Sequence, residues 1–319
     1  MIRALVLGIV QGLTEFLPIS SSAHLSIVPR LLGYPTPTLA FEVLLHFGTL
    51  AAVVAYFARD LWAFVLCLFA PGRLGPLEAR TRRRLLGLLA LASVPAAVIG
   101  FLVQDWADAQ TSRPLRASVW LVATTAILIA AELYARSQHR VLVTVPGDHE
   151  QDQPSGTAHL SPGTTVGRWA VPDGPTPDGP TPDGPGLPAE EELKRLPVAK
   201  AAGIGLAQAL ALVPGTSRSG ITISAGLFQG VSREAAARFS FLLSIPAILG
   251  AGILKLGELS GATETPAELV AGTLAAAISG FVAVSFLLRL LRTRTLWPFI
   301  WYRLIAGGLF VLLLATVRS

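Results

Sequence analysis

Six apolar stretches, each long enough to cross a membrane as a helix, constrain this chain of 319 residues more than any other feature. A helix needs roughly 20 apolar residues to span about 30 Å of hydrocarbon. Only 14% of the residues are charged, whereas about a quarter are charged in an average soluble domain. We therefore expect an all-α polytopic membrane protein with six transmembrane helices, at residues 39–58, 85–104, 117–134, 237–257, 269–288 and 298–317.

Four further apolar stretches are too short to span the membrane, at residues 2–17, 20–32, 198–213 and 219–230. Proline and small polar residues interrupt each pair, which is tolerated at membrane depth only where the backbone is buried in protein or faces a polar cavity. We expect each pair to form a re-entrant helical hairpin. The first pair also has features of a signal peptide, but Gln11 and Glu15 interrupt its apolar core and the same pattern returns in mid-chain.

The second hairpin repeats the pattern of the first. Residues 11–22 read Q-G-L-T-E-F-L-P-I-S-S-S, and residues 208–218 read Q-A-L-A-L-V-P-G-T-S-R. Three predicted spans separate the two hairpins, so the second must enter the membrane from the opposite side. We therefore expect an inverted repeat, with residues 1–136 as the first copy and residues 197–319 as the second. Such folds build their substrate sites near the bilayer midplane.

Residues 137–196 differ in composition from the rest of the chain. They hold 10 of the 23 prolines, and nine acidic against four basic side chains. Repeated P-D-G-P-T-P units bury almost no apolar surface, so we predict a disordered, Pro-rich insert. The remaining residues carry an excess of Lys and Arg, which in so apolar a chain is typical of membrane loops, and no nucleic-acid partner is expected.

The distribution of Lys and Arg predicts the orientation of the chain. Sixteen of these residues lie on one side of the predicted spans and six on the other. By the positive-inside rule the richer side is cytoplasmic. The insert is then cytoplasmic, and both termini and the opening of the first hairpin face the outer side. Cys67 is the sole cysteine, which excludes a disulfide framework and a thiolate metal cluster.

Residues suited to chemistry gather at the turns of the two hairpins. In the first, Gln11 and Glu15 share one helix face, and His24 and three serines follow, namely Ser20, Ser21 and Ser22. In the second, residues 214–220 read P-G-T-S-R-S-G and open a half-helix, whose positive end favours an anion. Arg218 adds a planar, permanently charged fork. An arginine near the bilayer centre costs at least about 2.5 kcal/mol, so it needs a partner such as a phosphate or Glu15.

Several of these residues also have a purely structural interpretation. Serines at a helix start commonly cap the helix, and a buried histidine such as His24 is as often a satisfied interior residue. Glu42 and His46 lie four residues apart and form either a second functional pair or a mutually satisfied interior pair. We favour the interior pair, because the aligned positions of the second copy hold serines. Glu132 and Arg303 are expected to be interior or interfacial partners.

Two sequence runs carry a family resemblance. Q-G-L-T-E-F-L-P-I-S-S-S-A-H at residues 11–24 and P-G-T-S-R-S-G at residues 214–220 resemble the signature regions of the bacterial undecaprenyl-diphosphate phosphatase family, the bacitracin-resistance type. The resemblance covers nearly the whole chain except the insert. It implies hydrolysis of undecaprenyl diphosphate to undecaprenyl phosphate and inorganic phosphate, which recycles the lipid carrier for cell-wall synthesis and confers bacitracin resistance. It also implies an active site facing the outer side of the bacterial inner membrane.

The resemblance implies a role for each residue of the two runs. The catalytic residues are Glu15, Ser21, His24 and Arg218. The substrate phosphate is bound by Ser20, Ser22, Ser217, Ser219, Gly220 and Thr222. A divalent metal, Mg²⁺ or Ca²⁺, is held by Glu15 and Gln11. Because Gln11 is a neutral amide, one carboxylate remains, and we expect the metal to bridge Glu15 and the diphosphate oxygens.

The residues leave several alternatives open. The attacking group is Ser21, water or His24, with Ser21 ranked first. Inverted re-entrant repeats are also a transporter architecture, so the alternative function is a transporter or flippase of a phosphorylated lipid. The expected partners are the polyprenyl diphosphate lipid and the bilayer. The oligomeric state is open, with a homodimer among the alternatives.

Overall fold

A computed structural model describes residues 1–111, 113–143 and 187–316 of the chain. The described residues form helices and connecting loops and contain no β-strand. The helices are α1 (Ile2–Phe16), α2 (Ser21–Leu31), α3 (Leu39–Tyr56), α4 (Ala58–Phe69), η1 (Pro71–Arg73), α5 (Pro76–Thr111), α6 (Pro114–Val143), α7 (Ala189–Lys194), α8 (Val198–Gln208), η2 (Ala209–Leu212), α9 (Arg218–Phe228), α10 (Arg233–Leu254), η3 (Leu256–Gly261), α11 (Pro266–Thr293) and α12 (Trp297–Thr316).

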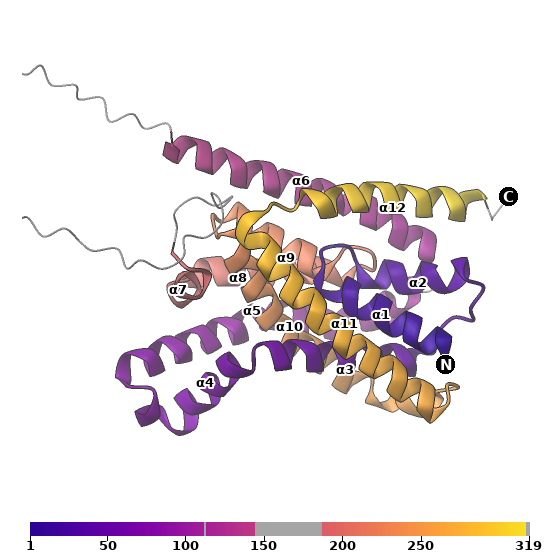
Figure 1. Ribbon diagram of the computed structural model, residues 1–319, viewed down its shortest axis with the longest axis horizontal. Coiled ribbons are helices and arrows are strands. Elements are labelled where there is room, and N and C mark those ends of the chain that lie inside the picture. Colours follow the sequence, from indigo (N-terminus) through magenta and orange to yellow (C-terminus); the bar gives the residue numbers. More distant parts are fainter. Residues whose placement is uncertain (112, 144–186, 317–319) are drawn as a thin grey trace, which may run out of the picture.

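The predicted membrane spans are confirmed. In the described part of the chain, α3, α5, α6, α10, α11 and α12 are the six helices long and apolar enough to cross a membrane. The fold is therefore an all-α polytopic membrane protein. Helices α12 and α6 run beside each other along one edge of the molecule, and α11 lies along α1 (Figure 1).

The four short apolar stretches form two pairs of helices, each interrupted by a turn. The first break, residues 17–20, separates α1 from α2, and the second break, residues 213–217, separates η2 from α9. Both breaks end in a serine with a positive φ: Ser20 has φ 72° and ψ 98°, and Ser217 has φ 71° and ψ 105°. The two breaks thus share an unusual backbone conformation immediately before a helix, as expected if the two hairpins are repeats.

Small residues allow α1 to approach α11 closely. A Cβ atom added to Gly8 would lie 2.3 Å from the carbonyl oxygen of Gly272, and one added to Gly12 would lie 2.5 Å from the carbonyl oxygen of Ala276. Within a membrane, helices associate through such close backbone packing because lipid supplies no hydrophobic driving force. This contact fixes α1, and with it Glu15, against the body of the protein.

The predicted limits of the insert were wrong at both ends. Helix α6 continues to Val143, and α7 forms within the stretch predicted to be disordered. Leu193 is buried, and Glu190 accepts a hydrogen bond from Arg82 of α5 at 2.8 Å. Glu192 also accepts from the Ser232 hydroxyl at the start of α10. These contacts order the end of the segment; residues 144–186 lie outside the described residues. Helix α4, whose 12 residues lie between the first two spans, was not predicted from the sequence.

Candidate active site

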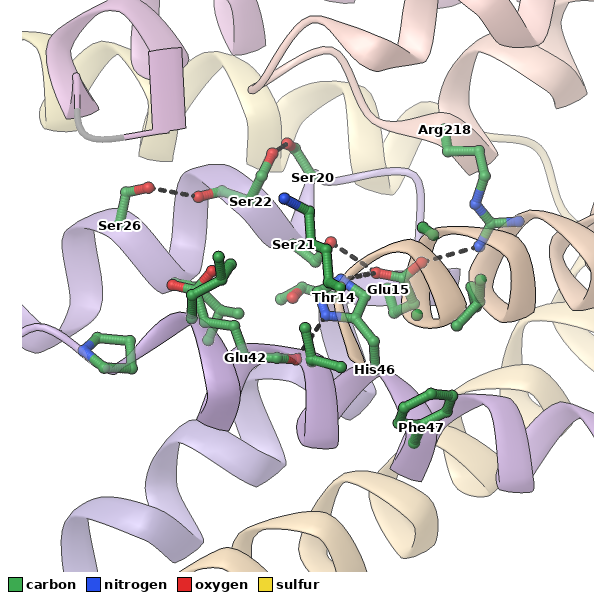
Figure 2. A pocket seen from close by; sticks show the side chains of 18 of the residues that line it. Thr14, Glu15, Ser20, Ser21, Ser22, Ser26, Glu42, His46, Phe47 and Arg218 are labelled. Atoms are coloured by element: carbon green, nitrogen blue, oxygen red, sulfur yellow. Dashed lines mark hydrogen bonds and ion pairs between the residues drawn. The ribbon is translucent and has the colours of Figure 1, made fainter. Parts of the chain in front are cut away.

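A cavity of about 660 Å³ lies where the two breaks meet. Its walls come from α1, α2, α3, α9 and α10, and we call it the active-site cavity. Six of the residues predicted for the site line it: Glu15, Ser20, Ser21, Ser22, Ser217 and Arg218. Figure 2 shows Arg218 reaching from the second hairpin toward Glu15 and Ser21 of the first. Residues of both hairpin breaks therefore line one cavity.

The Glu15 carboxylate is the centre of this arrangement. Its Oε1 accepts a hydrogen bond from Nη2 of Arg218 at 3.0 Å. Its Oε2 accepts from the hydroxyl of Ser21 at 2.7 Å and from Nε2 of Gln11 at 3.1 Å. Glu15 is buried, so a charged carboxylate there depends on these donors for its stability. Gln11 does not line the cavity. The nitrogen of its amide faces Glu15 and donates to it, so this contact helps to position the Glu15 carboxylate.

Arg218 is placed by the backbone of the second break. It is the first residue of α9 and follows Ser217, whose positive φ turns the chain. Its guanidinium reaches Glu15 with Nη2, and Nη1 lies 3.4 Å from the carbonyl oxygen of Ser240 on α10. The side chain is only 13% exposed. Such a desolvated, planar cation is suited to bind a phosphate group with two parallel hydrogen bonds.

The two helix starts at the breaks differ in their capping. At α9, the Ser217 hydroxyl accepts a hydrogen bond from the backbone N–H of Gly220 at 3.2 Å. At α2, the Ser20 side chain makes no capping hydrogen bond and lies 3.3 Å from the Ser22 hydroxyl instead. The positive end of α2 therefore offers the less satisfied N–H groups to an anion. From the sequence, an anion had been expected at the start of α9 instead, at Ser219 and Gly220.

Three residues predicted to bind phosphate lie behind the cavity wall. The Ser219 hydroxyl donates to the carbonyl of Leu17 at 3.1 Å, and the Thr222 hydroxyl lies 2.6 Å from that of Ser240. Both side chains are fully buried, and neither they nor Gly220 line the active-site cavity. The Ser219 contact joins the second hairpin to the first, and the Thr222 contact joins α9 to α10. Of the residues predicted to bind phosphate in the second break, only Ser217 and Arg218 line the cavity.

His24 does not face Arg218, contrary to the sequence prediction. Its Nδ1 lies 2.7 Å from the carbonyl oxygen of Ser20, and its Nε2 lies 2.7 Å from the hydroxyl of Tyr302 on α12. Because a carbonyl only accepts, Nδ1 carries the proton and, in the neutral ring, Nε2 accepts from the tyrosine. His24 lines a second cavity of about 470 Å³ and not the active-site cavity. The predicted meeting of Arg218 with the acid is correct, and that with the imidazole is wrong.

The expected interior pair of Glu42 and His46 is also corrected. Nδ1 of His46 donates to the backbone carbonyl of Glu42 at 2.7 Å, and its Nε2 points to Glu15, 3.7 Å from Oε2. Both Glu42 and His46 line the active-site cavity (Figure 2). The repeat had favoured the interior interpretation, because the residues aligned with Glu42 and His46 are Ser240 and Ser244.

The two other ionisable residues singled out in the sequence are interior. Glu132 accepts from Arg233 at 2.8 and 3.1 Å and from Arg136 at 3.2 Å, and lies away from both cavities. Arg303 is buried behind the breaks. In the described part of the chain, no group of three His, Cys, Asp or Glu side chains lies close enough to cage a metal ion. Two carboxylates, those of Glu15 and Glu42, line the active-site cavity.

The chain is similar to known proteins over nearly its whole length. The family model described as bacitracin resistance protein BacA matches residues 4–309. An undecaprenyl-diphosphatase of Alcanivorax borkumensis is 41% identical over 312 residues, which cover 96% of this chain and 96% of the relative. An undecaprenyl-diphosphatase of Geobacter sulfurreducens is 40% identical over 309 residues, covering 96% of this chain and 95% of the relative. The family model covers both hairpin breaks, the first five spans and the sixth as far as residue 309. The chain therefore belongs to the bacitracin resistance protein BacA family.

Proposed function

We propose that the protein hydrolyses undecaprenyl diphosphate to undecaprenyl phosphate and inorganic phosphate, as the name of its relatives indicates. The contact of Arg218 with the Glu15–Ser21 pair carries the proposal. A cation for the phosphate and a nucleophile each lie within hydrogen-bond distance of the same base, in one cavity. The reaction returns the carrier lipid to cell-wall synthesis and, as the family name indicates, confers resistance to bacitracin.

The cavity matches an amphipathic diphosphate. Arg218 and the start of α2 line its polar part and bind the terminal phosphate. Leu25, Val43, Phe47 and Ile248 line the same cavity and provide an apolar wall for the first part of the lipid chain. The substrate therefore lies with its diphosphate between the two breaks and its hydrocarbon toward the bilayer.

Substrate binding changes the partner of Arg218. Without substrate its guanidinium is paired with Glu15, which holds the carboxylate in its charged form and lowers its basicity. A terminal phosphate carries more negative charge than a carboxylate, so it draws the guanidinium away. Glu15 then keeps its hydrogen bond from Ser21 and becomes a stronger base. The cation that binds the phosphate thus also controls the base.

The short contact between Ser21 and Glu15 assigns the nucleophile in this proposal. Ser21 Oγ bonds to the terminal phosphorus, the bond from that phosphorus to the bridging oxygen breaks, and Glu15 takes the hydroxyl proton and passes it to the departing undecaprenyl phosphate. In the second step water bonds to phosphorus, and Glu15 moves a water proton to Ser21 Oγ as the P–Oγ bond breaks. Inorganic phosphate and free Ser21 result. Arg218 stabilises the charge of both transition states.

A divalent metal fits this site only together with the substrate. Glu15 and Glu42 place carboxylates on the cavity wall, and hard cations such as Mg²⁺ or Ca²⁺ prefer such ligands with diphosphate oxygens and water. Glu15 also pairs with Arg218, and the described residues form no three-ligand cluster, so the donor set favours a shared rather than a resident ion. A bound ion would neutralise part of the diphosphate charge.

The arrangement of charges supports an active site that faces the outer side. Thr36, Pro37 and Leu39, at the start of α3, line the active-site cavity. The opposite end of α3 leads into α4 and the start of α5, which carry six arginines: Arg59, Arg73, Arg80, Arg82, Arg83 and Arg84. By the positive-inside rule that end is cytoplasmic. The cavity then opens to the outer half of the membrane, and the insert between α6 and α7 is cytoplasmic.

Phosphate release by the purified protein in detergent tests the function. The wild type is expected to release inorganic phosphate from undecaprenyl diphosphate, and Glu15→Gln to lose about 10² to 10⁴-fold in kcat, the usual contribution of a general base. Detergent removes the sealed compartments that transport requires. A folded wild-type protein that binds the lipid but releases no phosphate would contradict the proposal and favour a carrier of phosphorylated lipid.

A further inference from the structure

Two neighbouring side chains of the last helix contact the breaks from outside the active-site cavity. Arg303 donates from Nη1 to the carbonyl oxygen of Pro18 at 3.1 Å, and its Nη2 lies 3.5 Å from that of Thr216. One guanidinium thus joins the first break to the second. Tyr302 reaches the first break through His24. Neither side chain lines the active-site cavity, and α12 itself packs along α6 (Figure 1).

The guanidinium of Arg303 is held on its other side by α6. Nε donates to the Thr125 hydroxyl at 2.9 Å and Nη2 to the carbonyl of Leu121 at 2.9 Å. The side chain is 1% exposed, and its partners within the described chain are carbonyl and hydroxyl oxygens. Its donors point in fixed directions in one plane. A lysine retains the charge, but its compact ammonium does not reproduce this planar set of contacts.

These contacts lie close in sequence to the reacting groups. Pro18 follows Glu15 by three residues, and Thr216 precedes Arg218 by two. Gly220 packs directly on Arg303, because a Cβ atom there would lie 3.0 Å from Nη1. Arg303 therefore fixes the separation of the two breaks, and with it the contact between Glu15 and Arg218.

The contact of Tyr302 with His24 acts on Ser20, the residue before the proposed nucleophile Ser21. The Tyr302 hydroxyl donates to Nε2 of His24, and Nδ1 of His24 donates to the carbonyl of Ser20, both at 2.7 Å. The two rings are also stacked, with centroids 5.7 Å apart. Ser20 has a positive φ of 72°, a conformation that persists only where the surroundings hold it. Tyr302 and His24 thus hold the backbone that presents Ser21.

We propose that Arg303 and Tyr302 are positioning residues for the phosphatase reaction. Arg303 sets the distance between the two breaks, and Tyr302, through His24, holds Ser20 in its strained conformation. This inference rests on the proposed function. It gives His24 a positioning role, because neither ring nitrogen is directed at the active-site cavity. Neither residue binds the substrate, so their loss reduces turnover more than substrate affinity.

Steady-state kinetics of purified variants in detergent tests the proposal, with kcat and KM measured separately per folded protein. Arg303→Lys is expected to lower kcat by about 10 to 100-fold, since misplacement by about 1 Å has effects of this size, and to change KM much less. Tyr302→Phe is expected to lower kcat by several-fold. In a protein that already carries His24→Ala, the same substitution should have no further effect on kcat, because Tyr302 acts through His24 and the effects of contacting residues are not additive. Wild-type kcat in folded Arg303→Lys, or independent effects of Tyr302→Phe and His24→Ala, would overturn it.

Two control variants separate positioning from general stability. Arg233→Lys alters another fully buried arginine, which pairs with Glu132 away from both cavities, and Tyr134→Phe removes a hydroxyl beside Phe228. Both are expected to keep wild-type kcat per folded protein. Equal losses in Arg233→Lys and Arg303→Lys would contradict the inference. Should Arg303→Lys not fold, Tyr302→Phe decides the test. A wild type without phosphate release would instead refute the proposed function itself.

Discussion

The guanidinium of Arg218 lies 3.0 Å from the carboxylate of Glu15, although 203 positions separate them in the sequence. The two residues belong to opposite hairpins, so their contact exists only while both breaks are in place. Because the pair is buried, removing one partner leaves the other charge without compensation. Substitutions at the two positions are therefore expected to differ in their effects on activity and on stability.

Arg218→Lys is expected to reduce kcat/KM by about 10² to 10³-fold, the effect of losing one preorganised transition-state donor. Lysine keeps the charge near Glu15 and so preserves much of the stability, but it cannot form two parallel bonds to a phosphate. Phosphate-release kinetics and a thermal melt in detergent measure both quantities. A lysine variant with wild-type kcat/KM would show that charge alone is required.

Ser21→Ala is expected to remove at least about 10³ of the rate, because it deletes the nucleophile of the proposed mechanism. Ser26→Ala is the matched control: Ser26 lines the same cavity, but its hydroxyl donates to the carbonyl of Ser22 within α2. A quench of the wild-type reaction is expected to trap phosphate on Ser21, detected by mass spectrometry. Equal activity of the two alanine variants would favour water as the direct nucleophile.

The sequence predicted those parts of the fold that depend on length and hydropathy alone. The helices α3, α10 and α12 begin within four residues of the predicted spans, because each is a single apolar run bounded by polar residues. The limits of α5 and α6 were predicted less well. The polar ends of these two helices extend beyond their apolar cores. Arg82, near the start of α5, is an example, because its ion pairs are with Asp60 and Glu190 of distant segments.

The contacts of a site residue were predicted correctly where the residue type restricts its partner. They were predicted wrongly where several partners lie within reach of the same group. An arginine at membrane depth needs a compensating partner, and Glu15 was one of the two partners predicted for Arg218. His24 had no such constraint, and its orientation depends on Tyr302, 278 residues away. Gly220 was expected to offer its N–H to phosphate, but the Ser217 hydroxyl accepts it. Which of several nearby partners a group bonds to depends on side-chain rotamers, which the sequence pattern does not give.

Gln11→Glu is expected to increase the dependence of activity on Mg²⁺. Nε2 of Gln11 donates to Glu15 at 3.1 Å, so a carboxylate at this position places two negative charges together unless a cation lies between them. Titration of phosphate release with Mg²⁺ after chelation measures the effect. The variant is expected to need less Mg²⁺ than the wild type for half of its maximal rate, and to lose more activity in chelator. Unchanged dependence would argue against metal binding at Glu15.

Glu264 is expected to make stability sensitive to acid. It lies in the loop before α11, where burial raises the pKa of its carboxyl but hydrogen bonds from Thr38 and the charge of Arg3 outweigh this, so the pKa lies below its usual value. The stabilisation is present above the usual carboxyl pKa of about 4.3 and is lost as the pH falls through the lower folded value. Glu264→Gln should therefore melt at a lower temperature near neutral pH, and its melting temperature should fall less than that of the wild type in acid.

Gly8→Ala is expected to destabilise the protein by about 1 to 3 kcal/mol, the usual effect of overpacking a tight contact. The added Cβ would lie 2.3 Å from the backbone carbonyl oxygen of Gly272, so α1 must move away from α11. Gly308→Ala in α12 is the matched control, because no atom lies within 4 Å of its added Cβ, and alanine is the better helix former by about 1 kcal/mol. Since α1 carries Glu15, the Gly8 variant should also lose activity in its folded fraction. Equal melting temperatures for the two variants would contradict the close packing of α1 on α11.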